Sequence, residues 1–186
     1  MKQRTISKPF TLSGPGLHTG NKTTITFESA PVGTGVVFIR DDLPSKPQIH
    51  VDFPHVMGVT RGTTIGTRDV HIHTVEHVLS ALSGMGVDNV FVHINSTEPP
   101  VLDGSAKLYV EAIHKSGLVE QPDGEKEYLE LKNKIEYING STSIVAEPSV
   151  EFEINYTIEY DYPSIGVQNF SLDVTPDNYR SLIAPA

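Results

Sequence analysis

The chain has 186 residues, a formal net charge of −9 and no cysteine, with 38% hydrophobic and 20% charged residues. These values describe a globular chain of one or two domains without disulfides or thiolate metal sites, so only His, Asp and Glu remain as metal ligands. The acidic balance argues against a nucleic-acid partner, because phosphate binding needs a basic face, but a few cations or backbone amides could still hold a nucleotide-sugar.

The sequence also lacks the signals that direct a chain to a membrane. No run approaches the roughly 18 apolar residues of a membrane span. Residues 1–4 lead into no signal-peptide core. We therefore expect a cytoplasmic protein without stable membrane insertion.

The first segments are typical of strands separated by a glycine-rich turn. Residues 4–12 and 22–28 are expected to be strands. Between them, SGPGLHTG at 13–20 holds three glycines and a proline, a composition typical of a tight turn that brings the backbone close to another group. His18 lies at the tip of this turn. From the residues alone it is either a loop histidine without a role or part of a site.

Strand patterns continue toward the centre of the chain. Residues 36–39 predict a short buried strand, and 48–65 predict strand segments that end in the RGTTI turn at 61–65. Arg61 in this turn is either a solvated strand end or a pocket residue, and the pattern favours neither.

Near residue 74 the hydrophobic period changes from that of a strand to that of a helix. Residues 70–73 alternate aliphatic side chains with histidines, as in a half-buried strand. The next apolar side chains recur at helical spacing and predict one buried stripe, formed by Val75, Val78, Leu79 and Leu82. Thr74 is the expected N-cap, and Gly84 and Gly86 are expected to end the helix. The opposite face then carries Glu76, His77, Ser80 and Gly84.

The next elements complete one layer of sheet and helix. Residues 87–94 predict an apolar strand with Val90, Val92 and Ile94 on one face. A second helix is expected from a cap at Ser105 to about residue 115, closed by a glycine at 117. Two helices over one sheet predict an α+β fold with one core.

The best candidate for a domain boundary is the polar, turn-rich stretch EQPDGEK at 120–126. We place a first α+β domain, which carries the HTVEH helix, at 1–121 and a second at 127–186. After the boundary the pattern predicts strands at 128–137, 142–147, 150–160 and 166–173, with a hairpin turn at Asn139-Gly140. The second half repeats the order of strand, glycine turn and strand seen in the first, which indicates a duplicated fold.

Residues 73–77 (HTVEH) also match H-x-x-E-H, the inverted zinc-peptidase pattern, in which two histidines bind zinc beside a catalytic glutamate. His73 lies before the expected helix start, so this spacing does not ensure the one-turn geometry that pairs two helical ligands. Such a peptidase also needs a glutamate ligand on a later helix, and no such helix pattern follows.

Four ordered motifs resemble those of one enzyme family. They are GPGLHTG at 14–20, RGTTI at 61–65, HTVEHVLSALSGMGVDN at 73–89 and EPPVLDGSA at 98–106. Together they resemble the zinc-dependent UDP-3-O-acyl-N-acetylglucosamine deacetylases of lipid A biosynthesis. RGTTI is similar to one branch of that family, in which the deacetylase is fused to a fatty-acid-type dehydratase.

The resemblance implies roles for the residues at the start of the helix. It implies that Glu76 is the general base of an amide hydrolase and that His77 is a ligand of the Zn²⁺ cofactor. The family usually has serine in place of His73, which implies that His73 is not a ligand. The other two zinc ligands are expected from a later H-x-x-x-D segment, and a general-acid histidine from further on, both beyond Ala186.

The resemblance also implies a set of contacts to a UDP-acyl-glucosamine substrate. Tyr160, in the sequence YDYP at 160–163, resembles the aromatic strand end near the uridine of that substrate. From the residues alone it could equally pack on its own sheet. The implied substrate-binding residues are His18, Arg61, Gly62, Thr63 and Tyr160.

We therefore expect two similar two-layer sheet/helix domains, the second truncated before its helices. Such a fragment should be inactive alone and, after chelation, essentially free of metal, with an exposed apolar sheet face that favours self-association. Two other readings remain open at this stage: an H-x-x-E-H type zinc peptidase and a non-catalytic binding domain.

Overall fold

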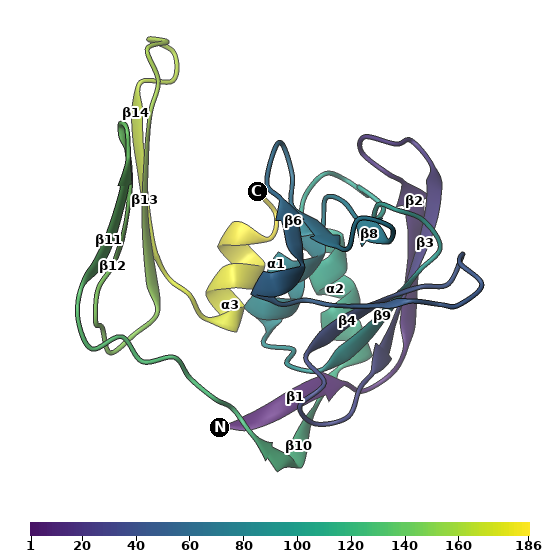
Figure 1. Cartoon of the computed structure of the whole chain (residues 1–186). Coiled ribbons are helices and arrows are strands. Elements are labelled where there is room, and N and C mark those ends of the chain that lie inside the picture. The colour runs from purple at the N-terminus through teal and green to yellow at the C-terminus, as the bar shows by residue number, and fades with distance from the viewer.

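The computed structural model describes residues 1–186 and has the mixed α+β character expected from the sequence. Residues up to about 126 form one body of sheets and helices, and two hairpins stand to one side of it (Figure 1). Each helix falls short of the length and apolar character that crossing a bilayer requires.

A five-stranded sheet forms the centre of the body. In spatial order its strands are β2 (Phe10–Pro15), β3 (Lys22–Ser29), β9 (Val90–Ile94), β4 (Val36–Arg40) and β5 (Gln48–His50). β4 and β9 run parallel, and the other neighbours run antiparallel. Val90, Val92 and Ile94 are fully buried. The predicted apolar face of this strand is therefore confirmed, and it explains why β9 occupies the middle of the sheet.

Two smaller sheets flank the central one. β1 (Lys2–Ile6) pairs with β10 (Leu118–Glu125). The turn η1 (Phe53–His55) leads into a sheet of β6 (Val56–Gly58), β7 (Thr64–Gly66) and β8 (His71–Ile72).

The single strand predicted over 4–12 is wrong, because the chain breaks between β1 and β2. The N–H of Ser7 donates to the carbonyl of Gly117 at 2.8 Å, and the N–H of Lys8 donates to the hydroxyl of Ser116 at 3.3 Å. Pro9 has no N–H to donate. These backbone groups are therefore satisfied outside a strand ladder.

Helices α1 (Glu76–Met85) and α2 (Lys107–Ser116) pack against each other and share one hydrophobic core with the sheet. The predicted stripe of the first helix is confirmed: Val75, Val78 and Leu82 are buried, and Leu79 is partly buried against them. The glycines that follow α1 and α2, at 86 and 117, have φ values of 71° and 79° and close the two helices.

The predicted N-caps of the two helices, Thr74 and Ser105, are wrong. Val75, not Thr74, is the N-cap of α1, and no side chain caps it. Thr74 has a φ of 54°, and its hydroxyl donates to Glu98 at 2.9 Å instead of accepting a hydrogen bond from an N–H of the first helical turn. Ser105 lies one position before the N-cap of α2, and its hydroxyl accepts from the N–H of Lys107 at 3.1 Å.

The polar stretch at 120–126, predicted to be a domain boundary, is mostly strand. β10 pairs with β1 from Leu118 onward, with a bulge before Glu125. Glu125 also pairs with Lys2 Nζ at 2.5 Å, and the N–H of Lys126 donates to the carbonyl of Met1 at 2.9 Å. The first body therefore extends past residue 121. The division into two domains remains a prediction.

The second half consists of two antiparallel hairpins. β11 (Ile135–Asn139) pairs with β12 (Thr142–Ala146), and β13 (Glu153–Glu159) pairs with β14 (Val167–Asp173). The predicted hairpin turn is confirmed, since Asn139 pairs with Thr142 and Gly140 has a φ of 61°. Large apolar side chains stay exposed on both hairpins, including Tyr137, Ile144 and Phe152. Self-association through them remains a prediction.

After the hairpins the chain returns to the body through α3 (Pro176–Asn178) and η2 (Tyr179–Ile183), which lie beside α1 (Figure 1). The predicted helix start is confirmed: Thr175 is the N-cap, and its hydroxyl accepts from the N–H of Asn178 at 3.2 Å. Tyr179 is only 4% exposed. The polar face of α1 is therefore partly covered by the chain's own C-terminal segment.

A glycine on α1 makes room for the Tyr179 ring. A Cβ added to Gly84 would overlap the ring, so only glycine allows this contact. The hydroxyl of Tyr179 lies 2.6 Å from the hydroxyl of Ser80, one turn earlier. Burial raises the pKa of Tyr179, and the hydrogen bond to Ser80 only partly offsets that effect.

Gly84→Ala tests this contact. In an open helix, alanine in place of glycine stabilises by about 1 kcal/mol. Here the added methyl group must displace the tyrosine ring, so we expect a loss of about 1–3 kcal/mol in the free energy of unfolding, measured by urea denaturation. Tyr179→Phe removes only the hydrogen bond and should lose about 1 kcal/mol. A stabilising effect of Gly84→Ala would show that Tyr179 does not occupy this position.

Candidate functional site

Four segments meet at one side of the body around an open hollow, which we name the Glu98 hollow. They are the β2–β3 loop (16–21), the β6–β7 loop (59–63), the β8–α1 junction (73–75) and the segment after β9 (95–102). The hollow measures about 360 Å³, and no hydrophobic residue lines it. Its lining side chains include His18, Thr19, Arg61, His73, Thr74 and Glu98.

The carboxylate of Glu98 is fully buried and binds four donors from two segments. The N–H of His18 lies 3.1 Å from both of its oxygens. The N–H and the hydroxyl of Thr19 each donate to Oε2 at 2.9 Å, and the hydroxyl of Thr74 donates to Oε1 at 2.9 Å. Burial by itself would raise the pKa of the Glu98 carboxyl, but these hydrogen bonds outweigh it and hold that pKa below its ordinary value.

Gly16 allows the β2–β3 loop to approach this carboxylate. A Cβ at Gly16 would lie 2.5 Å from Glu98 Oε2 and 2.6 Å from Thr19 Oγ1, closer than real side chains come. The same loop is fixed further by the N–H of Val101, which donates to the carbonyl of Pro15 at 2.8 Å. The motifs GPGLHTG and EPPVLDGSA are therefore two sides of one contact.

Thr74 occupies a conformation that β-branched residues rarely adopt. Its φ of 54° lies in the left-handed region, which costs a non-glycine residue about 1–2 kcal/mol. The preceding residue is anchored as well, because the N–H of His73 donates to the carbonyl of Thr97 at 2.8 Å. The chain thus turns sharply at Thr74, between the end of β8 and the first turn of α1.

Glu76 lies in the first turn of α1 and is held by the β6–β7 loop. Its Oε1 accepts a hydrogen bond from the N–H of Thr63. Gly62 packs against the same oxygen, since a Cβ there would lie 3.6 Å from it. The other oxygen, Oε2, is buried and has no hydrogen-bond partner. A buried carboxylate oxygen without a partner is costly, and such atoms occur where a site binds water, substrate or an ion.

His77 lines a second and smaller cavity of about 130 Å³, which we name the His77 pocket. Thr74 lines this pocket as well as the Glu98 hollow, so it separates the two. The other walls are largely apolar, and they include Leu17, Val78, Pro100 and Tyr109.

His73 does not share a cavity with His77. Its Nδ1 lies 2.9 Å from the hydroxyl of Thr64. Its ring packs edge to face on that of His71, with the two ring centroids 4.7 Å apart. Burial, with a smaller contribution from His71, lowers the pKa of His73. His73 lines the Glu98 hollow, on the other side of Thr74 from His77.

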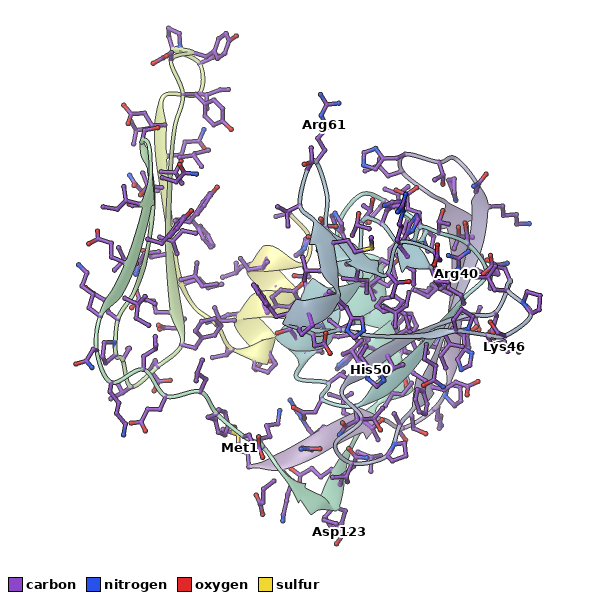
Figure 2. All side chains as sticks on the ribbon, viewed as in Figure 1. Met1, Arg40, Lys46, His50, Arg61 and Asp123 are labelled. Atoms are coloured by element: carbon purple, nitrogen blue, oxygen red, sulfur yellow. The ribbon has the colours of Figure 1, made fainter.

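The remaining predicted site residues lie at different distances from this centre. His18 is at the tip of the β2–β3 loop, with an exposed side chain at the rim of the Glu98 hollow. Figure 2 shows the side chain of Arg61 pointing away from the body at the tip of the β6–β7 loop. Tyr160 is 53% exposed and lies at the far end of the β13–β14 hairpin. The structure therefore brings His18, Gly62, Thr63, Glu76 and His77 to one side of the body, whereas the Arg61 side chain points away from it and Tyr160 lies far from it.

The donor set fits part of a zinc site. An imidazole is a usual zinc ligand, and the unpartnered oxygen of Glu76, next to His77 in the sequence, suits a carboxylate that accepts a proton from water. The described residues bring no three His, Asp or Glu side chains into an arrangement that could hold a metal ion. Catalytic zinc sites use three protein ligands, so these residues fit one ligand and the neighbouring base.

Sequence reasoning missed the two residues that join the site. Glu98 stood within a recognised motif, but its burial depends on contacts with residues 18, 19 and 74, which are distant in the chain. The available signal was an acidic residue directly before Pro99-Pro100, at the end of an apolar strand. Thr74 was taken for a helix cap, and nothing in its neighbours indicated a positive φ.

Comparisons with known proteins show the family to which the chain belongs. Residues 3–186 match the family described as UDP-3-O-acyl N-acetylglycosamine deacetylase. The bifunctional enzyme LpxC/FabZ of Chlorobaculum tepidum is 45% identical over 172 residues, which cover 91% of this chain and 37% of the relative.

Two deacetylases are similar over almost all of the chain. The UDP-3-O-acyl-N-acetylglucosamine deacetylases of Myxococcus xanthus and Bdellovibrio bacteriovorus are 38% and 36% identical over 184 residues. These residues are 99% of this chain and 58% and 61% of the two relatives. The chain therefore spans less than two thirds of the length of the relatives it matches.

The buried carboxylate of Glu98 should make stability depend on acid pH. Its pKa in the folded protein lies below the ordinary value of 4.5, so its contribution is complete above that value and is lost as the pH falls through the folded-state pKa. Glu98→Gln removes this titration. The difference in free energy of unfolding between wild type and Glu98→Gln, measured with urea, should therefore shrink between about pH 5 and about pH 2. A constant difference over this range would contradict the assignment.

Proposed function

Because this chain belongs to the UDP-3-O-acyl-N-acetylglucosamine deacetylase family, we propose that it supplies the general base and one metal ligand of that reaction. The reaction is hydrolysis of the N-acetyl group of a UDP-3-O-acyl-N-acetylglucosamine, a step of lipid A synthesis. The observation that carries the proposal is the carboxylate of Glu76, with one oxygen fixed by the β6–β7 loop and the other buried without a partner.

The role proposed for Glu76 is to take a proton from water, and the geometry of its carboxylate supports this role. The N–H of Thr63 fixes one oxygen and so orients the carboxylate. The free oxygen then accepts the proton of the attacking water. The water oxygen bonds to the carbonyl carbon, and the amide C–N bond then breaks as the departing nitrogen takes up the proton that Glu76 removed; the products are acetate and a free amine.

His77 is the metal ligand that we assign within this chain. It follows Glu76 directly, lies in the first turn of α1 and lines its own pocket. When bound, a zinc ion lowers the pKa of its water to about 7 and polarises the carbonyl to be attacked. The remaining protein ligands are proposed to come from outside residues 1–186.

The substrate contacts form the other half of the proposal. His18 and Arg61 belong to the two loops that border the Glu98 hollow, and the Arg61 guanidinium, which points outward at its loop tip, would have to turn toward the hollow to bind the anionic diphosphate of a UDP-sugar. Gly62 and Thr63 hold the loop against Glu76. Tyr160 would contact the uridine only if the β13–β14 hairpin approached this side of the body. A fused second activity, such as the bifunctional relative has by name, is a further proposal for the whole protein.

The roles of Glu76 and His77 can be separated by mutation in the full-length protein. Glu76→Gln keeps an acceptor for the N–H of Thr63 but cannot take a proton, so kcat should fall by roughly 10²-fold or more while zinc content stays near wild type. His77→Ala should lose both zinc and activity, because a catalytic zinc needs three protein ligands. Atomic absorption and a deacetylation assay measure the two effects.

Glu111→Gln, at an exposed position on α2, is the matched control and should leave zinc content and turnover unchanged. Loss of zinc in the Glu76→Gln variant would contradict the division of roles between the two residues.

His73→Ser distinguishes the deacetylase from an H-x-x-E-H peptidase. His73 lies across Thr74 from His77 and is not assigned to the metal, so the variant should retain zinc and nearly normal turnover. In a peptidase of that type the same change removes a ligand and abolishes zinc binding. Zinc content and turnover of the full-length variant decide between the two functions.

A further inference from the structure

We propose that Glu98 is a positioning residue of the deacetylation reaction, one that fixes the His18 loop and the start of helix α1 relative to each other. The inference rests on the proposed function. Glu98 itself reaches neither Glu76 nor His77, so its effect on the reaction passes through Thr74 and through the β2–β3 loop.

The β2–β3 loop is bound to Glu98 through three of its donors. Its residues 18 and 19 give two backbone N–H groups and one hydroxyl to the carboxylate of Glu98. The loop can approach this closely only because residue 16 is glycine. Without the carboxylate, three donors would face one another at a buried position, and the loop that carries His18 would have no fixed place.

The turn at Thr74 is the second feature that depends on Glu98. A β-branched residue with positive φ persists only when its surroundings hold it there. The hydroxyl bond to Glu98 provides such a restraint on the side chain. Because Thr74 is two residues before Glu76, its backbone angles set the direction in which α1 begins. The position of Glu76 and His77 therefore depends on that bond.

Glu98 can act in this way because its own segment is anchored. The hydroxyl of Tyr109, a buried residue of α2, donates to the carbonyl of Pro100 at 2.6 Å. The carbonyl of Thr97 accepts from the N–H of His73 at 2.8 Å. The segment is thus anchored on both sides of Glu98, at Thr97 and at Pro100. Such anchoring matters for a positioning residue, because a misplacement of about 1 Å can cost 10²-fold in rate.

Two substitutions at Thr74 provide the sharpest test in the full-length protein. Thr74→Val and Thr74→Gly both remove the hydroxyl that binds Glu98. Valine is β-branched and still disfavours the positive φ, whereas glycine adopts it freely. If the hydroxyl bond holds the turn, Thr74→Val should lower kcat by about 10²-fold. Thr74→Gly should lower kcat by no more than about 10-fold. Equal losses in the two variants would overturn the proposal for Thr74.

Glu98→Gln tests the loop as well. An amide has one acceptor oxygen in place of two, so it must leave a donor of the loop or of Thr74 unpaired. We expect a fall in kcat of about 10–10²-fold with zinc content near wild type. Hydrogen exchange by mass spectrometry should become faster in peptides that cover residues 16–21. Normal kcat and unchanged exchange in that loop would overturn the proposal.

Asp88→Asn is the matched control for this variant. The carboxylate of Asp88 accepts from the N–H of Arg4 at 2.7 Å and pairs with Lys126 at 2.9 Å, at the other end of α1. The change is the same in chemistry, so it should reduce stability without lowering kcat. An equal fall in kcat would show that the loss of any carboxylate that accepts from a backbone N–H slows the enzyme, which would overturn a specific role for Glu98.

Different results would refute the deacetylase function and the positioning role of Glu98. A wild-type protein that binds zinc but does not deacetylate its substrate would refute the proposed function. The exchange measurement would still decide whether Glu98 fixes the His18 loop. If Glu98→Gln does not fold, the comparison of Thr74→Val with Thr74→Gly remains decisive, because both variants keep the carboxylate and its bonds to the loop.

Discussion

The arrangement of the candidate site depends on the need to satisfy one buried carboxylate. Glu98 cannot remain ionised away from water unless donors surround it, and the chain provides them from the β2–β3 loop and from Thr74. Each donor constrains the segment that supplies it. The close approach at Gly16 and the left-handed turn at Thr74 are both features of this contact. One electrostatic requirement thus relates two motifs that lie about 80 residues apart in the chain.

Helix α1 carries different contacts along its length. Its first turn holds Glu76 and His77, and its later turns hold Ser80 and Gly84 against Tyr179. The C-terminal segment of the chain therefore packs on the same helix whose first turn carries the glutamate proposed as the base, although it contributes no side chain to the hollow.

Much of the fold follows from hydrophobic period. The buried faces of β9 and α1 are visible in the sequence because packing against a sheet demands apolar residues at fixed spacing. β10 was missed for the opposite reason: backbone bonds to β1 hold this edge strand, and its polar side chains carry no period. In the same way, the cap rule failed at Thr74 because a contact to Glu98, 24 residues later, outweighed the local preference.

The candidate site shows the same division. Glu76, His77, His18 and Arg61 were expected from motifs, and the structure places them around one side of the body. The partner of each could not be read from the sequence, since the pairing of Thr63 with Glu76 depends on how a loop of one small sheet meets the helix. Burial and unpaired atoms are properties of the folded chain.

The wall between the two cavities has a thermodynamic consequence. Thr74 lines both the Glu98 hollow and the His77 pocket, and its hydroxyl is bound to Glu98. A small molecule that presses on this residue from one cavity changes the shape of the other. Affinities of fragments bound in the two cavities should then not add, and a compound built by joining them would bind with a free energy different from the sum of its parts.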